Sequence, residues 1–406
     1  MALSSITTNL VVKKWSSDFF KYGLGKMYFS KFVGSWGKAF DPAMGDKRDV
    51  VLSDPNAIVQ VKMDLSRGIG DTITFPMLAP LSGLGRVQKA TAYQGGSGQN
   101  TVRALENNEE AFNQYSWPVT LLEWAHAVRT IGKLMERQPA FSVSDSMTAN
   151  LGLWWARVLD LATYNAMAGI SMVDDGGTVK IITGTAPSTG RKLVGGCKAG
   201  TVTFRTTDAA LDAAEYMCFE MVDEARRKAM SELLPDGTTA CPTIRPVIVG
   251  GREMYYMFLH PKQVRDLRYD AGGSVNITWK EAQMNAAARG AENLIFRNAL
   301  GIYNDVALFE YPRVASRAGT GAGEDLATNT FDTSDVVKNG TTAYRALFCG
   351  AGAAVHAYGS MPDFVDETFE YKTQKGRCLQ TIIAIDRPEF NSIDYGVMSV
   401  DTAAST

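Results

Sequence analysis

The sequence Ile58-Val59-Gln60-Val61-Lys62-Met63 alternates apolar and polar residues, as does Thr72-Ile73-Thr74-Phe75-Pro76 after it. The same alternation returns in Ala111-Phe112-Asn113-Gln114-Tyr115-Ser116-Trp117-Pro118-Val119. A period of two is typical of β-strands with one face to cover, so residues 57–118 are predicted to form a long two-stranded ribbon. The link between the two runs is rich in glycine and polar residues, which cannot build a core of their own.

A two-stranded ribbon on its own is marginally stable in water. The sequence offers almost nothing to lie beneath this one, which indicates that another molecule supplies the missing surface. The chain is therefore interpreted as one component of a larger assembly.

Composition sets the bounds on what the rest of the chain can be. With 406 residues, two or three lobes are expected, and 45% hydrophobic and 21% charged residues are ordinary for a folded soluble protein. The net charge of −2 excludes a strongly basic nucleic-acid binder. Five scattered cysteines indicate reduced thiols in a cytosolic setting. There is neither a signal-peptide pattern nor an apolar run of the ~20 residues that span a bilayer, so no membrane association is expected.

The first 56 residues are predicted to form an arm in which aromatic residues alternate with lysines. Through residue 48, eight basic residues face three acidic ones, a local balance of +5. Such an arm is expected to insert its aromatics into neighbouring chains while its lysines meet acidic partners, and the alternative is an amphipathic helix lying on its own domain. The residues predicted to form the assembly interface of the arm and ribbon are Trp15, Phe19, Phe20, Phe29, Phe32, Trp36, Leu84, Gly95, Gly96, Glu106, Glu109 and Glu110.

Helical and strand-like patterns then mix irregularly, which predicts the α+β class. Helices are expected at 120–137, 142–170, 208–234, 261–269 and 278–289, and strands at 246–250, 255–259, 306–310, 368–373 and 379–385. Residues 171–205 are expected to be turns and short strands on a surface, 318–341 a surface loop, and 344–358 a buried strand or helix.

A search for catalytic chemistry finds almost nothing. The three histidines, His126, His260 and His356, lie far apart and near no cysteine pair, which excludes the usual zinc spacings. There is no G-x-S-x-G elbow and no complete phosphate-binding loop. No catalytic, cofactor-binding or metal-binding residue is predicted, and the chain is not expected to be an enzyme.

The order of the parts resembles the major capsid proteins of tailed phages with the Hong Kong-97-type fold, and more closely the family typified by the coat protein of coliphage N-four. The residues that carry the match are Lys13-Lys14-Trp15, Tyr28-Phe29-Ser30-Lys31-Phe32-Val33-Gly34, Gly70-Asp71-Thr72-Ile73-Thr74-Phe75, Leu81-Ser82-Gly83-Leu84-Gly85, His260-Pro261-Lys262-Gln263-Val264-Arg265-Asp266-Leu267-Arg268-Tyr269-Asp270, Trp279 and Gly301-Ile302-Tyr303-Asn304-Asp305-Val306.

The resemblance implies five parts: an N-terminal arm (1–56), an extended loop (57–118), a peripheral lobe with a spine helix (119–170), a mainly axial lobe (171–345) and closing strands of the peripheral lobe (346–406). It implies hexamers and pentamers of this chain in an icosahedral virion shell around double-stranded DNA, assembled in the host cytoplasm. Portal, scaffold or decoration proteins would be its partners, with weak, non-specific contact to DNA.

The acidic loop tip usual in that fold is replaced here by Gly95-Gly96-Ser97-Gly98-Gln99-Asn100, with the acids displaced to Glu106–Glu110. Two other interpretations stay open. One is a soluble enzyme with an unrecognised site, and the other is the shell of a cellular nanocompartment of the same fold, which would enclose enzymes and not DNA.

Overall fold

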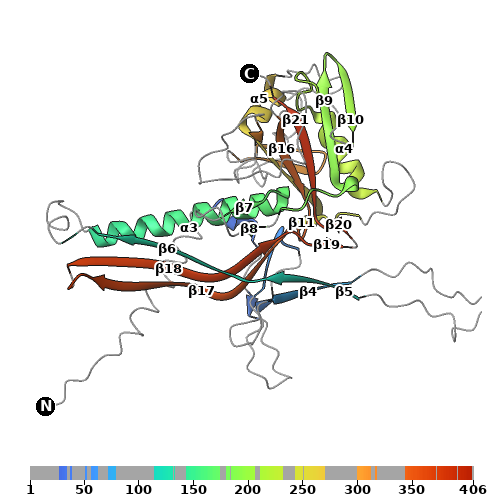
Figure 1. The fold of residues 1–406 in the computed structure, drawn as a ribbon. Helices are drawn as coiled ribbons and strands as arrows, with labels where there is room; N and C mark the ends of the chain where they lie inside the picture. The colour runs from blue at the N-terminus through green and yellow to red at the C-terminus, as the bar shows by residue number, and fades with distance from the viewer. Residues whose placement is uncertain are drawn as a thin grey trace, which may run out of the picture.

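The computed structural model describes residues 27–33, 37–38, 51–52, 56–62, 72–78, 114–130, 132, 143–173, 180–182, 184–205, 211–231, 243–249, 251–269, 300–311, 316–317, 343–371, 373–390 and 392–404. Within these residues the chain forms an elongated limb, made of one long helix on a four-stranded sheet, joined to a rounder body around a nine-stranded sheet (Figure 1). The mixed α+β composition agrees with the prediction.

Helix α3 (Val143–Ala168) confirms the helix predicted at 142–170. At 1.5 Å per residue its 26 residues span about 39 Å. It ends at Gly169, where φ is +70° and a Cβ atom would stand 2.2 Å from the Thr185 carbonyl oxygen. Only glycine fits this position, because both the left-handed backbone and the close approach exclude a side chain.

The four-stranded sheet has the order β3-β17-β18-β6. Strands β17 (Ala354–Phe369) and β18 (Gln374–Asp386) form a long antiparallel hairpin, β3 (Val59–Lys62) runs parallel to β17, and β6 (Leu122–Arg129) pairs with β18. Helix α3 lies along one face, as Figure 1 shows, where Trp155 and Leu159 pack with Trp124, Ile383 and Ile385. The predicted strand pair at 368–373 and 379–385 is confirmed as a hairpin. The first strand ends at Phe369, however, and not at residue 373 as predicted.

Strand β6 overturns the helix predicted at 120–137 over residues 122–129, whereas 133–137 lie outside the described residues. The segment contains good helix formers, but Leu122, Trp124, His126 and Val128 also alternate along it, and these residues are more buried than those between them. Pairing with β18 over eight residues decides between the two patterns, since tertiary contacts override local propensity.

The ribbon is formed by β4 (Thr72–Leu78) and β5 (Gln114–Thr120), antiparallel from Thr72 opposite Thr120 to Leu78 opposite Gln114. This confirms a two-stranded ribbon within 57–118, with residues 79–113 outside the described part of the chain. The first predicted strand run, 58–63, is not part of it, because β3 pairs with β17 in the four-stranded sheet.

The nine-stranded sheet has the order β10-β9-β21-β16-β12-β14-β13, with β11 beside β12 and β15 beside β16. Its strands are β9 (Lys192–Lys198), β10 (Thr201–Arg205), β11 (Val247–Val249), β12 (Arg252–Leu259), β13 (Gly301–Tyr303), β14 (Val306–Glu310), β15 (Ser316–Arg317), β16 (Ala343–Cys349) and β21 (Val397–Ala403). Strands β11, β12 and β14 confirm the predictions at 246–250, 255–259 and 306–310. The region 344–358 contains β16 and the start of β17, so its strand alternative is correct.

Side chains alternate between two buried faces along β12. Tyr255, Met257 and Leu259 pack on one face against helix α4 (Phe219–Met230) and helix α5 (Pro261–Tyr269). Tyr256 and Phe258 point to the opposite face, where Tyr164 and Met167 near the end of α3 are packed. Helix α3 therefore joins both sheets, covering the four-stranded one with its middle and the nine-stranded one with its last turns.

Three predictions from the sequence are corrected here. The segment 346–406 is not one set of closing strands, because β16 and β21 lie in the nine-stranded sheet and β17 and β18 in the four-stranded one. Helix α4 is shorter than the predicted 208–234. Six of the seven residues of β9 are buried, so the prediction that 171–205 forms turns and short strands on a surface is wrong for this strand.

Helix α5 matches its predicted bounds, whereas 278–289 and 318–341 lie outside the described residues. The remaining short elements are η1 (Phe29–Lys31), β1 (Gly37–Lys38), β2 (Val51–Leu52), β7 (Met172–Val173), β8 (Lys180–Ile182), η2 (Thr189–Arg191), β19 (Glu389–Phe390) and β20 (Ile393–Asp394).

Candidate assembly interface

The described part of the N-terminal segment, residues 27–33, is attached to the chain's own core. Phe29 has no exposed surface, and its ring lies 5.2 Å from each of the rings of Phe258 and Tyr311. The prediction that Phe29 inserts into a neighbouring chain is therefore wrong. Phe32 is partly buried, with its ring 5.1 Å from those of Phe258 and Phe309.

An acid on α3 fixes this segment. The carboxylate of Asp160 accepts hydrogen bonds from the backbone N–H groups of Tyr28, at 2.8 Å, and Phe29, at 3.1 Å. The Tyr28 hydroxyl also donates to the Glu310 carbonyl oxygen at 2.9 Å. Sequence reasoning missed Asp160, although a carboxylate inside an apolar helical stripe is a signal that it needs a buried partner.

The other predicted interface residues lie outside the described part of the chain. They are Trp15, Phe19, Phe20, Trp36, Leu84, Gly95, Gly96, Glu106, Glu109 and Glu110. Their role therefore stays a prediction.

The base of the ribbon has a small core of its own. Ile73, Phe75 and Val119 pack against Val355 and Ala384, on the face of the four-stranded sheet opposite α3. The opposite face of the ribbon base presents Thr72, Thr74, Ser116, Pro118 and Thr120 to solvent. The expectation that almost nothing lies beneath the ribbon is therefore wrong for its base.

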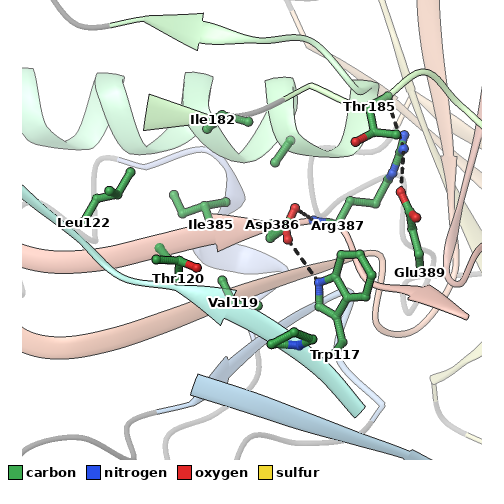
Figure 2. A pocket seen from close by; sticks show the side chains of 13 residues that line it. Trp117, Val119, Thr120, Leu122, Ile182, Thr185, Ile385, Asp386, Arg387 and Glu389 are labelled. Carbon is green, nitrogen blue, oxygen red and sulfur yellow. Dashed lines mark hydrogen bonds and ion pairs between the residues drawn. The ribbon is translucent and has the colours of Figure 1, made fainter. Parts of the chain in front are cut away.

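A pocket of about 330 Å³ lies where the ribbon base meets β6, β18 and α3. Figure 2 shows Trp117 at its edge, with the indole Nε1–H donating to the Asp386 carboxylate at 3.0 Å. Burial raises the pKa of Asp386 above its usual range. The Arg387 side chain donates to the Thr185 carbonyl oxygen at 2.9 Å and forms ion pairs with Asp394 at 2.9 Å and Glu389 at 3.6 Å.

These charged groups hold the pocket wall together. Asp386 receives hydrogen bonds from Trp117 and from the Arg387 backbone N–H at 2.8 Å, and Arg387 joins β18 to the segments at 185 and 394. The arrangement is a joint between the ribbon and the limb, and it positions the ribbon relative to the sheet.

Beyond the ribbon base, the sheet face opposite α3 is open in the described structure. Val365, Cys378 and Ala127 lie side by side on it, and Val365 is 42% exposed. Ile382, on the same face, is 37% exposed. On the other side of the limb, Leu153 of α3 is 44% exposed. An extended single-layer sheet with exposed apolar residues offers area for contact with other protein chains.

The histidines are held apart and serve packing. His356 is buried between α3 and β17, bonded to the Thr163 hydroxyl at 2.9 Å, and burial lowers its pKa to about 3. His126 stacks on Trp154 with ring centroids 4.2 Å apart. His260 accepts a hydrogen bond from the Lys262 backbone N–H at 3.1 Å, and burial lowers its pKa to about 4.

Among the described residues, no cluster of three or more His, Cys, Asp or Glu side chains is arranged to hold a metal ion. None of the four cysteines that the structure describes is in a disulfide bond. In the same part of the chain, no helix has both the length and the apolar character needed to cross a membrane.

Comparison with known proteins extends over almost the whole chain. The major capsid protein of Pseudomonas phage KPP25 is 22% identical over 420 residues, which cover 98% of this chain and 96% of that protein. The capsid of Ralstonia phage GP4 superposes with a TM-score of 0.65 at 24% identity, covering 92% of this chain and 99% of its own. The Cyanophage Pam1 capsid gives 0.59 at 22% identity, covering 86% and 89% of the two chains.

These likenesses show a phage capsid fold, in agreement with the fold class that the sequence predicted. The family model described as "Phage capsid protein" matches residues 5–406. This chain therefore belongs to the phage capsid protein family.

Proposed function

We propose that this chain is the major capsid protein of a tailed bacteriophage. Copies of it assemble into hexamers and pentamers, which close into an icosahedral head shell around double-stranded DNA. The single observation that carries the proposal is the family match over residues 5–406, because it includes both sheets, α3 and the ribbon. The elongated limb supports it as well, since a single-layer sheet covered by one helix leaves much surface for other copies.

Within this proposal, α3 is the spine helix and its four-stranded sheet is the peripheral lobe. The nine-stranded sheet is the axial lobe, residues 1–56 the N-terminal arm and 57–118 the extended loop. The ribbon described at 72–78 and 114–120 is the base of that loop. Its further part, with Leu84 and Gly95 to Glu110, lies across the next subunit, and the closer relationship is with the coat protein of coliphage N-four.

The partners of the shell are other copies of the chain first, and then the portal and scaffold or decoration proteins. The net charge of −2 supports weak, non-specific contact with the packaged DNA, because a strongly basic wall would hold the genome tightly. The protein functions in the virion and assembles in the host cytoplasm.

The loop assignment is tested by deleting residues 82–108 or replacing them with a Gly-Ser linker of equal length. Both variants are expected to give a soluble subunit with the wild-type circular dichroism spectrum that forms no shells, because the contact across the next subunit is lost. Negative-stain images of wild type and variants at equal concentration provide the measurement. Shells of normal size from either variant would show that the loop is not needed for assembly.

The content of native particles tests the function itself. Nuclease-protected double-stranded DNA is expected inside particles purified from an infected host. Particles that enclose protein cargo without DNA would instead identify a nanocompartment shell.

A further inference from the structure

The end of the β17–β18 hairpin lies at the tip of the limb farthest from the nine-stranded sheet (Figure 1). Tyr371 is in the turn between these two strands. Tyr371 is 101% exposed, whereas Tyr164, Tyr311 and Tyr358 are among the largest fully buried side chains. A phenol ring is a large apolar surface with one polar atom, and among the described residues only Tyr269 and Phe204 also expose more than a third of an aromatic side chain, at 80% and 42%. The exposure of this one needs an explanation.

The backbone of the turn is in a conformation that disfavours these residues. Glu370 has a φ of +47° and Tyr371 a φ of +52°, both in the left-handed region. Glycine or asparagine would adopt it more readily than a residue with a long side chain. A strained position that keeps an exposed tyrosine, where glycine would be more stable, points to a role for the side chain.

The turn is held by its neighbours. The Thr373 backbone N–H donates to the Glu370 carbonyl oxygen at 3.0 Å, and the Thr373 hydroxyl donates to the same oxygen at 2.5 Å. The Gln374 side-chain amide donates to the Glu370 carboxylate at 2.8 Å. These bonds fix the direction in which the following residue, Tyr371, leaves the hairpin.

A second set of contacts stiffens the strands behind the turn. The Arg129 guanidinium lies 4.3 Å from the centre of the Phe369 ring and 3.7 Å from the Glu370 carboxylate. The Phe369 ring covers Gly376, where a Cβ atom would stand 2.7 Å from it. Edge strand β6 is thereby attached to the end of the hairpin behind the exposed tip.

We propose that Tyr371 is an anchor of an interface between copies of this chain, inserted by the hairpin tip into an apolar depression on a second copy. Tyrosine is favoured at the centre of interfaces because it buries a large ring with few rotatable bonds and donates one hydrogen bond. The hydrogen bonds within the turn reduce the conformational freedom that the tip would lose on binding. The second copy is the partner because the chain belongs to a capsid family, and this inference rests on the proposed shell function.

Tyr371→Gly gives the sharpest test, because a structural role and an interface role predict opposite results. Glycine relieves the left-handed backbone at φ +52°, so the isolated subunit is expected to be at least as stable as wild type in urea unfolding. Assembly is expected to require about a thirtyfold higher subunit concentration, the loss typical of an interface anchor. Tyr371→Ala should weaken assembly to the same extent.

Tyr269 at the end of α5 is the matched control, since it is also a tyrosine and 80% exposed. Tyr269→Ala should change the assembly concentration by less than about threefold, within the range of a surface substitution. Light scattering and mass photometry over a concentration series give the measurement.

The inference is overturned if Tyr371→Gly assembles at the wild-type concentration, or if Tyr269→Ala impairs assembly as strongly. Wild-type protein that forms no closed shells would instead refute the proposed function, so the two failures are distinguishable.

Discussion

The buried His356 makes the limb sensitive to acid. The Thr163 hydroxyl donates to the Leu159 carbonyl oxygen at 2.7 Å, so the hydrogen bond of 2.9 Å between Thr163 and His356 has the Nε2–H of the imidazole as its donor. The ring is 1% exposed, and burial lowers its pKa from 6.5 to about 3. Protonating it in the folded state would place a charge between α3 and β17.

The direction and size of this pH effect on stability follow from the difference in proton binding between the folded and unfolded chain. Between pH 6.5 and about 3 the unfolded chain binds a proton on His356 that the folded chain does not, so stability falls as the pH is lowered. The slope is about 1.4 kcal/mol per pH unit, and the full loss is on the order of 5 kcal/mol. This is comparable with the whole stability of many folded proteins.

His356→Gln isolates this effect, because glutamine can still donate to the Thr163 hydroxyl but does not titrate. Urea unfolding of the unassembled subunit at pH 7.5, 6, 5 and 4 gives the free energy of unfolding at each pH. The wild type should lose about 1.4 kcal/mol more per pH unit than the variant between pH 6 and 4. His260→Gln, at a half-buried histidine whose pKa is lowered to about 4, should reduce the slope at most to a similar extent above pH 5 and by less between pH 5 and 4. Equal slopes for His356→Gln and wild type would refute the reasoning.

Two further substitutions test the core and the joint. Asp401→Asn breaks a buried bidentate pair with Arg345, whose Nε and Nη2 lie 2.9 and 2.8 Å from the carboxylate, and should lower the free energy of unfolding by about 3–5 kcal/mol. In the same urea titration Glu224→Gln, in a surface pair with Arg227, should cost less than about 1 kcal/mol, and equal losses would contradict the buried-pair argument. Trp117→Phe replaces the indole with a smaller aromatic ring and removes the donor to Asp386, so amide exchange of β4 and β5 should accelerate about tenfold or more while β6 is unaffected. Unchanged exchange in the ribbon would show that this hydrogen bond does not hold its base.

Long local patterns were predictable from the sequence. The apolar stripe of α3 continues over many turns, and Gly169 marks its end, so both bounds were within two residues of those observed. Helix α5 begins at Pro261, a residue favoured in the first turn of a helix. The alternation in 72–76 and 114–119 predicted a paired ribbon because each strand carries its own signal.

Pairings between distant segments were not predictable. Strand β6 contains Ala, Leu and Glu, which also suit a helix, and only β18, more than two hundred residues later, decides its conformation. The place of β16 and β21 in the nine-stranded sheet depends on register with β12 and β9. The sequence around Phe29 is as aromatic and basic as an exposed interface segment would be. Its partners in the fold, Asp160 in α3 and the rings of Phe258 and Tyr311, are all more than a hundred residues away in the sequence.

The attachment of α3 to both sheets affects how the subunit can deform. One continuous rod is embedded in two layers, so a twist applied at the far hairpin is transmitted along it and does not dissipate at a hinge between them. Differences in local curvature of a shell must then be accommodated at the ribbon base. The Trp117 indole and a six-residue apolar cluster attach the ribbon base to the limb in the described structure. Stiffness of the limb and compliance of the ribbon would let a single polypeptide occupy positions that are not equivalent.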